Sequence, residues 1–213
     1  MFSNRPFILR ITSATAAGAG ALVLLTACGG GGDSAMSGHA MPTTSGAAAT
    51  PTGTQPAASF NDADVMFAQM MIPHHQQAVE MAELAATRAK DPEVKELAAK
   101  IKAAQDPEIK TMRGWLQEWG EPVPTGTGDL RGMGHGMPGM MSAEDMKELA
   151  DAKGATFDKH FTEMMIAHHE GAVEMARTEQ AEGADPEAKD LAKTIESSQQ
   201  TEIEQMRQIL DRL

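Results

Sequence analysis

The sequence predicts an all-α protein, a four-helix bundle built from two duplicated helix hairpins with one short extra helix. The first observation is an internal repeat, since residues 64–119 align without a gap on residues 158–213 with 25 identities in 56 positions. The second is composition: Ala, Glu, Met, Leu and Lys dominate both repeats, and these residues favour helix. The third is a DPE tripeptide in each repeat, which is typical of a helix start. Two similar hairpins that each need a partner surface predict one bundle.

Residues 1–27 have the pattern of a secretory signal. Arg5 and Arg10 precede the apolar run 14–25, and small residues follow up to Cys28. A basic region, a short apolar segment and a small-residue cleavage site are typical of export. The residues before the cysteine resemble a bacterial lipobox, which predicts a lipoprotein signal peptide and a lipidated Cys28. An ordinary signal or a short membrane anchor is the alternative.

Charge and cysteine content exclude several classes of function. Cys28 is the only cysteine, so internal disulfides and cysteine-based metal or redox centres are excluded. The net charge of −12 disfavours nucleic acid and gives no attraction to anionic lipid. We therefore expect attachment to the membrane through the lipid alone, at the periplasmic or extracytoplasmic face of the cell envelope. Residues 28–59, rich in Gly, Ser, Thr, Ala and Pro, are expected to be a flexible tether.

The rest of the chain divides into three parts. Residues 60–120 form the first hairpin repeat, residues 121–142 form a linker rich in Gly, Met and His, and residues 143–213 hold the short helix and the second repeat. In each repeat the Asp of DPE is an N-cap and the Pro takes the first helical position. Ser142, with Asp145 three residues later, predicts a capping box for the short helix. The expected helices span residues 61–89, 92–119, 143–152, 156–182 and 186–212.

Two near-identical motifs, MMIPHHQQAVEMA from Met70 and MMIAHHEGAVEMA from Met164, place paired methionines one helical turn before paired histidines. Residues four apart share a helix face, so each methionine pairs with the histidine one turn later. His160 extends the row of the second motif by one more turn. The candidate metal ligands on these two helices are Met70, Met71, His74, His75, His160, Met164, Met165, His168 and His169.

Angular positions separate the two histidines of each motif. At about 100° per residue, His74 lies at the centre of the apolar stripe of its helix and His75 lies at the margin. The repeat places His168 centrally and His169 marginally. We expect the two motif helices to face each other inside the bundle, with the central histidines close enough to share one ion.

The second helix of each hairpin carries a glutamate on its apolar stripe, Glu108 in the first repeat and Glu202 in the second. Burying an unpaired carboxylate is costly, so both need a partner. We expect them to approach the layer of the central histidines as metal ligands or as hydrogen-bond acceptors. Met112 and Met206, on the same stripes, are further candidate ligands.

Methionine and histidine also recur outside the predicted helices, in MSGHAM (36–41) and GMGHGMPGMM (132–141). These segments are rich in glycine, so packing in a core does not explain their methionines. Met133, His135 and Met137 of the linker are therefore further candidate ligands. Biased loop composition is the alternative.

The doubled motif, followed on the next helix by Q-xx-EI-xx-M, resembles the DUF305 family over residues 60–213. The resemblance implies a ferritin-like helical bundle in an exported bacterial protein. It also implies copper binding, because the family includes exported copper-binding proteins, and this implication falls on the methionine and histidine pairs of the two motifs. Only the second repeat has His160, where the first has Met66, so the two hairpins are expected to differ in affinity.

Three functions are consistent with these residues. Thioether and imidazole are the ligands that Cu(I) prefers, and imidazole with carboxylate also suits Cu(II) and Zn(II). The leading interpretation is a non-catalytic protein that binds copper, rather than zinc or iron, for buffering, resistance or delivery to a partner protein. The second is a ferritin-like di-metal carboxylate oxidase, although the Glu-x-x-His spacing of such enzymes is absent. The third is a metal-free structural or adaptor bundle, in which the methionines and histidines are ordinary core residues.

Overall fold

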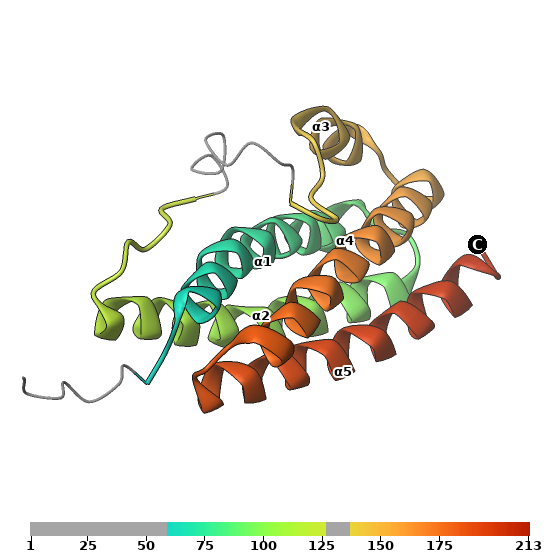
Figure 1. The fold of residues 1–213 in the computed structure, drawn as a ribbon. Helices are drawn as coiled ribbons and strands as arrows, with labels where there is room; N and C mark the ends of the chain where they lie inside the picture. Colours follow the sequence, from blue (N-terminus) through green and yellow to red (C-terminus); the bar gives the residue numbers. More distant parts are fainter. Residues whose placement is uncertain (1–58, 127–136) are drawn as a thin grey trace, which may run out of the picture. The chain divides into compact units, whose positions relative to one another are not determined.

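The computed structural model describes residues 59–126 and 137–213, and helices account for most of them (Figure 1). Every predicted helix is present, each end lies within two residues of its predicted position, and these two ranges contain no strand. The prediction of an all-α fold is confirmed. The helices are α1 (Asp62–Arg88), α2 (Pro92–Trp119), α3 (Ala143–Asp151), α4 (Ala155–Glu182) and α5 (Pro186–Leu210).

Local signals explain where the helices begin. Asp91 before α2 and Asp185 before α5 are N-caps, and each side chain accepts hydrogen bonds from two backbone N–H groups of the first turn. A proline follows each cap, at the position where a missing N–H costs nothing. Ser142 and Asp145 form the predicted capping box of α3. These caps set the boundaries of the hairpins.

The long helices pack as two hairpins that together form a four-helix bundle. α1 lies along α2, and α4 lies along α5 (Figure 1). The hairpins meet mainly through α1 and α4, whereas α2 and α5 touch over a short length. α3 contacts both α1 and α4. The contact between α1 and α4 is therefore the seam of the bundle.

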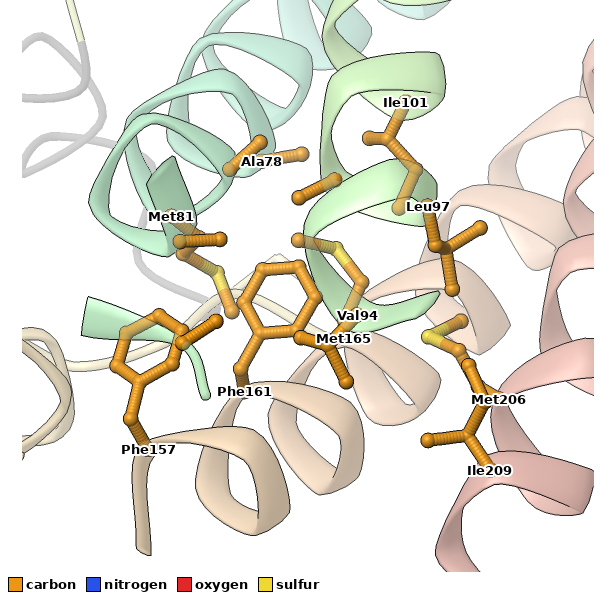
Figure 2. Close-up of a cluster of buried hydrophobic side chains, with 14 of the residues drawn as sticks. Ala78, Met81, Val94, Leu97, Ile101, Phe157, Phe161, Met165, Met206 and Ile209 are labelled. Atoms are coloured by element: carbon orange, nitrogen blue, oxygen red, sulfur yellow. The ribbon is translucent and has the colours of Figure 1, made fainter. Parts of the chain in front are cut away.

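One apolar cluster joins the second half of α1 to the first half of α4, and α2 and α5 close it from the other side (Figure 2). All four long helices contribute buried side chains to it, so it fixes the hairpins against each other. We call it the first apolar cluster. Its members include Met81, Leu97, Ile101, Phe157, Phe161, Met165, Met206 and Ile209.

The second apolar cluster joins the first half of α1 to the second half of α4. Because opposite halves of α1 and α4 meet, these two helices run antiparallel and the repeats are related by an approximate two-fold axis. Polar residues lie between the clusters on all four helices, and they form the layer described below. Members of the second cluster include Phe67, Met71, Ile72, Met112, Trp115, Leu116, Met175 and Ile195.

Two buried aspartates tie each hairpin to the turn of the other. Asp64 of α1 is fully buried and accepts hydrogen bonds from the backbone N–H groups of Ala184 and Asp185, in the turn between α4 and α5. Its repeat mate Asp158 of α4 caps the corresponding turn between α1 and α2. Burial acts to raise the pKa of Asp64, but the backbone N–H donors and a hydrogen bond with Glu179 outweigh burial and hold that pKa below its ordinary value. The two aspartates therefore reinforce the seam at both ends.

Several predicted features lie outside the described residues. These are the signal peptide (1–27), lipidation at Cys28, the tether (28–59) except for its last residue, and the MSGHAM segment. Within residues 59–126 and 137–213, no helix is long and apolar enough to cross a membrane.

Candidate metal centre

Four histidine side chains lie in the polar layer between the two apolar clusters. His74 and His75 come from α1, His168 and His169 come from α4, and all four are fully buried. The rings of His74 and His168 meet across the seam, with centroids 3.7 Å apart and planes tilted by 40°. The centroids of His168 and His169 are 6.4 Å apart. The duplicated motif thus brings its two central histidines into contact.

The outer histidines, His75 and His169, are each held by a glutamate of their own hairpin. Nε2 of His75 lies 2.7 Å from Oε2 of Glu108, and Nε2 of His169 lies 2.8 Å from Oε2 of Glu202. A carboxylate accepts, so Nε2–H of each ring donates, and Nδ1 of the neutral ring carries the lone pair. A carboxylate in this position orients a histidine ligand and raises its basicity.

The central histidines have fewer partners. Nε2 of His74 lies 3.1 Å from the carbonyl oxygen of Pro138 and donates to it, so Nδ1 of that ring carries the lone pair. No donor reaches this Nδ1, nor the Nδ1 atoms of the outer pair, and neither ring nitrogen of His168 has a hydrogen-bond partner. Buried polar atoms in a structural layer are normally paired. Unpaired lone pairs that converge on one layer are instead typical of a ligand site.

Burial keeps the central rings uncharged. It lowers the pKa of His74 to about 3, and the charge of the neighbouring His75 adds to the effect. Burial is also the largest cause of the lowered pKa of His168, followed by the charges of the other three histidines. Both rings are therefore neutral at pH 7, which is the state in which imidazole binds a metal ion.

One expectation about this layer is wrong. His75 and His169 are fully buried instead of marginal, because α1 and α4 each pack between two neighbours and bury a wider arc than one stripe predicts. Glu108 and Glu202 accept hydrogen bonds in this layer, as expected, but from the outer pair of histidines and not from the central one. The glutamates reach the layer, but they approach it from the hairpin side.

The motif methionines lie on either side of the histidine layer. Met70 and Met164 are half-buried and pack at the edges of the clusters. The others have the environment of core residues, which is the alternative that the sequence left open for them. Fully buried within the two apolar clusters are Met71, Met112, Met165 and Met206.

The remaining candidates are not brought into the layer. His160 is partly exposed, and its Nδ1 lies 3.7 Å from a carboxylate oxygen of Glu148 on α3. Eight residues, about 12 Å along the helix axis, separate it from His168. Met137 is buried, whereas Met133 and His135 lie outside the described residues. Among the described residues, no three His, Cys, Asp or Glu side chains are arranged as a complete ligand set, so the part of the layer with the geometry of a site is the central pair His74 and His168.

The end of the linker forms a strap, residues 137–141, across the histidine layer. Gln77 of α1 donates to the carbonyl oxygen of Met141 at 2.9 Å and accepts from its N–H at 2.7 Å. On α4 the strap runs so close to Gly171 that a Cβ there would lie 2.0 Å from the carbonyl oxygen of Pro138. This strap was not predicted from the sequence. The signal was that Gly171 takes the place of its repeat mate Gln77, which leaves room for a backbone to pass.

Replacing Gly171 by alanine is expected to displace the strap and destabilise the fold by about 1–3 kcal/mol, since overpacking against backbone cannot be relieved by a rotamer change. The displaced carbonyl of Pro138 would no longer hold His74. Urea unfolding measures the first effect, and NMR of the imidazole N–H signals measures the second. Gly114→Ala is the matched control, because a Cβ at Gly114 meets nothing within 4 Å. Equal losses of stability in both variants would contradict the close packing.

Fold and site together define a duplicated helix-hairpin bundle with a buried histidine layer at its seam. The family model described as "Domain of unknown function (DUF305)" matches residues 64–210, and the chain belongs to this family. The resemblance drawn from the sequence is confirmed. A comparison with functionally curated proteins gives no match.

Solved structures share this fold. A DUF305 protein from Streptomyces coelicolor is 37% identical over 70% of this chain and 92% of that chain, with a TM-score of 0.63. CopM in the Cu(II)-bound form is 41% identical over 70% of this chain and 95% of that chain, with a TM-score of 0.60. CopM in the Cu(I)-bound form is 39% identical over 68% of this chain and 93% of that chain, with a TM-score of 0.56.

Proposed function

We propose that this protein is a non-catalytic copper-binding protein that holds Cu(I) or Cu(II) at the histidine layer. The observation that carries the proposal is the buried, neutral pair His74 and His168, whose rings meet across the seam and each keep at least one unpaired nitrogen. The outer histidines and the half-buried Met164 are the further proposed ligands. Imidazole and thioether together favour copper over zinc or iron.

The likeness to CopM supports the choice of metal. That protein has been solved with Cu(I), Cu(II) and Ag bound, and it matches this chain at 39–41% identity over more than nine tenths of its own length. In this proposal Glu108 and Glu202 are not ligands. They orient the outer histidines through Nε2, which leaves Nδ1 for the ion.

The proposed setting is the outer face of a membrane. Export and lipidation at Cys28 rest on the pattern of residues 1–28. A copper-binding domain held in this way would buffer metal at the envelope, contribute to copper resistance, or pass the ion to a partner protein. Attachment depends on the lipid, because the surface charge is acidic.

Metal analysis of the protein purified from copper-supplemented cells tests this function. We expect at least one equivalent of copper per chain, and less zinc and iron than copper. Added Cu(I) should also raise the melting temperature, since an ion that binds only the folded state stabilises it. A protein that carries no copper, and whose melting temperature copper does not change, would instead be a metal-free structural bundle.

Oxygen consumption distinguishes the binding protein from a di-metal oxidase. The two glutamates that such a centre would use are each bound to the Nε2 atom of an outer histidine in this structure. We therefore expect no oxygen uptake when Fe(II) is added to the protein. Sustained uptake that depends on Glu108 and Glu202 would identify an enzyme.

A further inference from the structure

A pocket of about 390 Å³ opens beside the histidine layer, between the first half of α1 and the second half of α4. Met66 and Met70 of α1 line it together with Met175 and Glu179 of α4. The strap closes one side through Pro138, the residue whose carbonyl holds a central histidine. The pocket thus adjoins the layer but is lined by none of its four histidines.

Glu179 is the feature that core packing does not explain. Its side chain is 1% exposed, no N–H group donates to either carboxylate oxygen, and it shares a hydrogen bond with the buried carboxyl group of Asp64. Its repeat mate is Ala85, so the related position in the other hairpin has no acid. Burial, and the Asp64 carboxylate beside it, raise the pKa of Glu179 to about 8. A cation bound beside these two buried carboxyl groups would offset the repulsion between them.

The other residues of the pocket favour a cation. Asp62, Glu174 and Glu182 also line it, and none of its described lining residues is Lys, Arg or His, although the charge of Lys189 acts on Glu179. Carboxylates around a cleft raise the local concentration of cations. Met66 is 58% exposed, so its thioether is open to solvent at the mouth of the pocket, whereas Met175 is buried.

We propose that this pocket is a second metal site, which binds a soft monovalent cation, Cu(I) or Ag(I), through the thioethers of Met66, Met70 and Met175 and the carboxylate of Glu179. Thioethers select soft ions over Ca²⁺, Mg²⁺ and Zn²⁺, and the carboxylate balances the charge of the ion. The proposal goes beyond the histidine centre and does not depend on it. The repeat mates of the four proposed ligands are His160, Met164, Met81 and Ala85. We therefore expect one such pocket and not two.

Titration of the full chain with silver nitrate in chloride-free buffer tests the proposal. With methionine methyl groups labelled with ¹³C, NMR signals of Met66, Met70 and Met175 should shift together as Ag⁺ is added. The Met66→Leu/Met175→Leu variant should bind one equivalent fewer, or bind that equivalent at least about tenfold more weakly, because leucine keeps the volume but has no sulfur. Glu179→Gln should weaken the same equivalent.

Two control proteins make the result decisive. Met146→Leu changes a half-buried methionine outside the pocket and should bind Ag⁺ as the wild type does. His74→Leu/His168→Leu removes the central histidines and should keep the three methyl shifts, even if the histidine centre proves not to bind metal. The pocket proposal is overturned if Met66→Leu/Met175→Leu binds all equivalents unchanged. It is equally overturned if the methyl shifts are absent, or if they disappear in the variant without the central histidines.

Discussion

Replacing His74 and His168 together by leucine is expected to weaken Cu(I) binding by at least about a hundredfold. Removing only an outer partner of a histidine ligand costs about 10–100-fold in affinity, and here two ligands are removed at once. The ring centroids of His74 and His168 lie 3.7 Å apart, and both rings are neutral. The wild type therefore binds Cu(I) without first losing a proton from an imidazolium ring. Competition of the full chain against a colorimetric Cu(I) chelator measures the change.

His160→Leu is the matched control for this variant. His160 lies on the same helix as His168, but it faces α3 and lies outside the layer. We expect its Cu(I) affinity to equal that of the wild type. If the double variant also binds as tightly as the wild type, the histidine layer is not the copper site, and the proposal made for it fails.

Stability separates a ligand role from a structural one. Neither ring nitrogen of His168 has a hydrogen-bond partner, so His168→Leu replaces a buried unpaired polar group by an apolar one of similar size. Such a change is expected to leave the free energy of unfolding of the metal-free protein unchanged or higher. If His168 had a structural role instead, the same substitution would lower the free energy of unfolding of the protein. A more stable protein with weaker copper binding would therefore show that the histidine serves the metal.

The sequence predicted the helices well because their signals are local. The DPE caps, the Ser142 capping box and the gapless repeat each act within a few residues or within one hairpin, and they place every helix end to within two residues. The contact between His74 and His168 was also predictable, because a duplicated apolar stripe buries its centre against its own copy. The prediction from the sequence agrees with the structure wherever the position of a residue depends on its own helix and on one neighbouring helix.

What the sequence could not predict depends on a second neighbour. The burial of His75 follows from α2, which covers the side of α1 that a single stripe leaves at the margin. The strap depends on where the linker packs against the helices, and Gly171 is the residue in the sequence that indicates this packing. Glu179 has no repeat mate of its kind, so a search built on the duplication passes over it. Differences between the repeats are therefore as informative as the identities.

Replacing Asp158 by alanine is expected to lower the free energy of unfolding by about 3 kcal/mol, a large part of the 5–15 kcal/mol typical of a domain. The side chain is 1% exposed and accepts hydrogen bonds from the N–H groups of Lys90 and Asp91, both at 2.9 Å. Alanine leaves both donors unpaired at the start of α2 and removes a negative charge from the positive end of that helix. Urea unfolding followed by tryptophan fluorescence measures the loss.

The expected loss of stability comes from the hydrogen bonds between Asp158 of one hairpin and the turn of the other hairpin. The two control variants test this origin. Glu163→Ala removes an acid from the same helix, but Glu163 is half-exposed with an ion pair to Lys159 at 3.8 Å, so little change is expected. Asp158→Asn keeps one acceptor oxygen and should lose about half as much as alanine. Amide exchange at Lys90 and Asp91 should speed up in both Asp158 variants. A loss in Asp158→Ala no larger than in Glu163→Ala would mean that the apolar clusters alone hold the hairpins together.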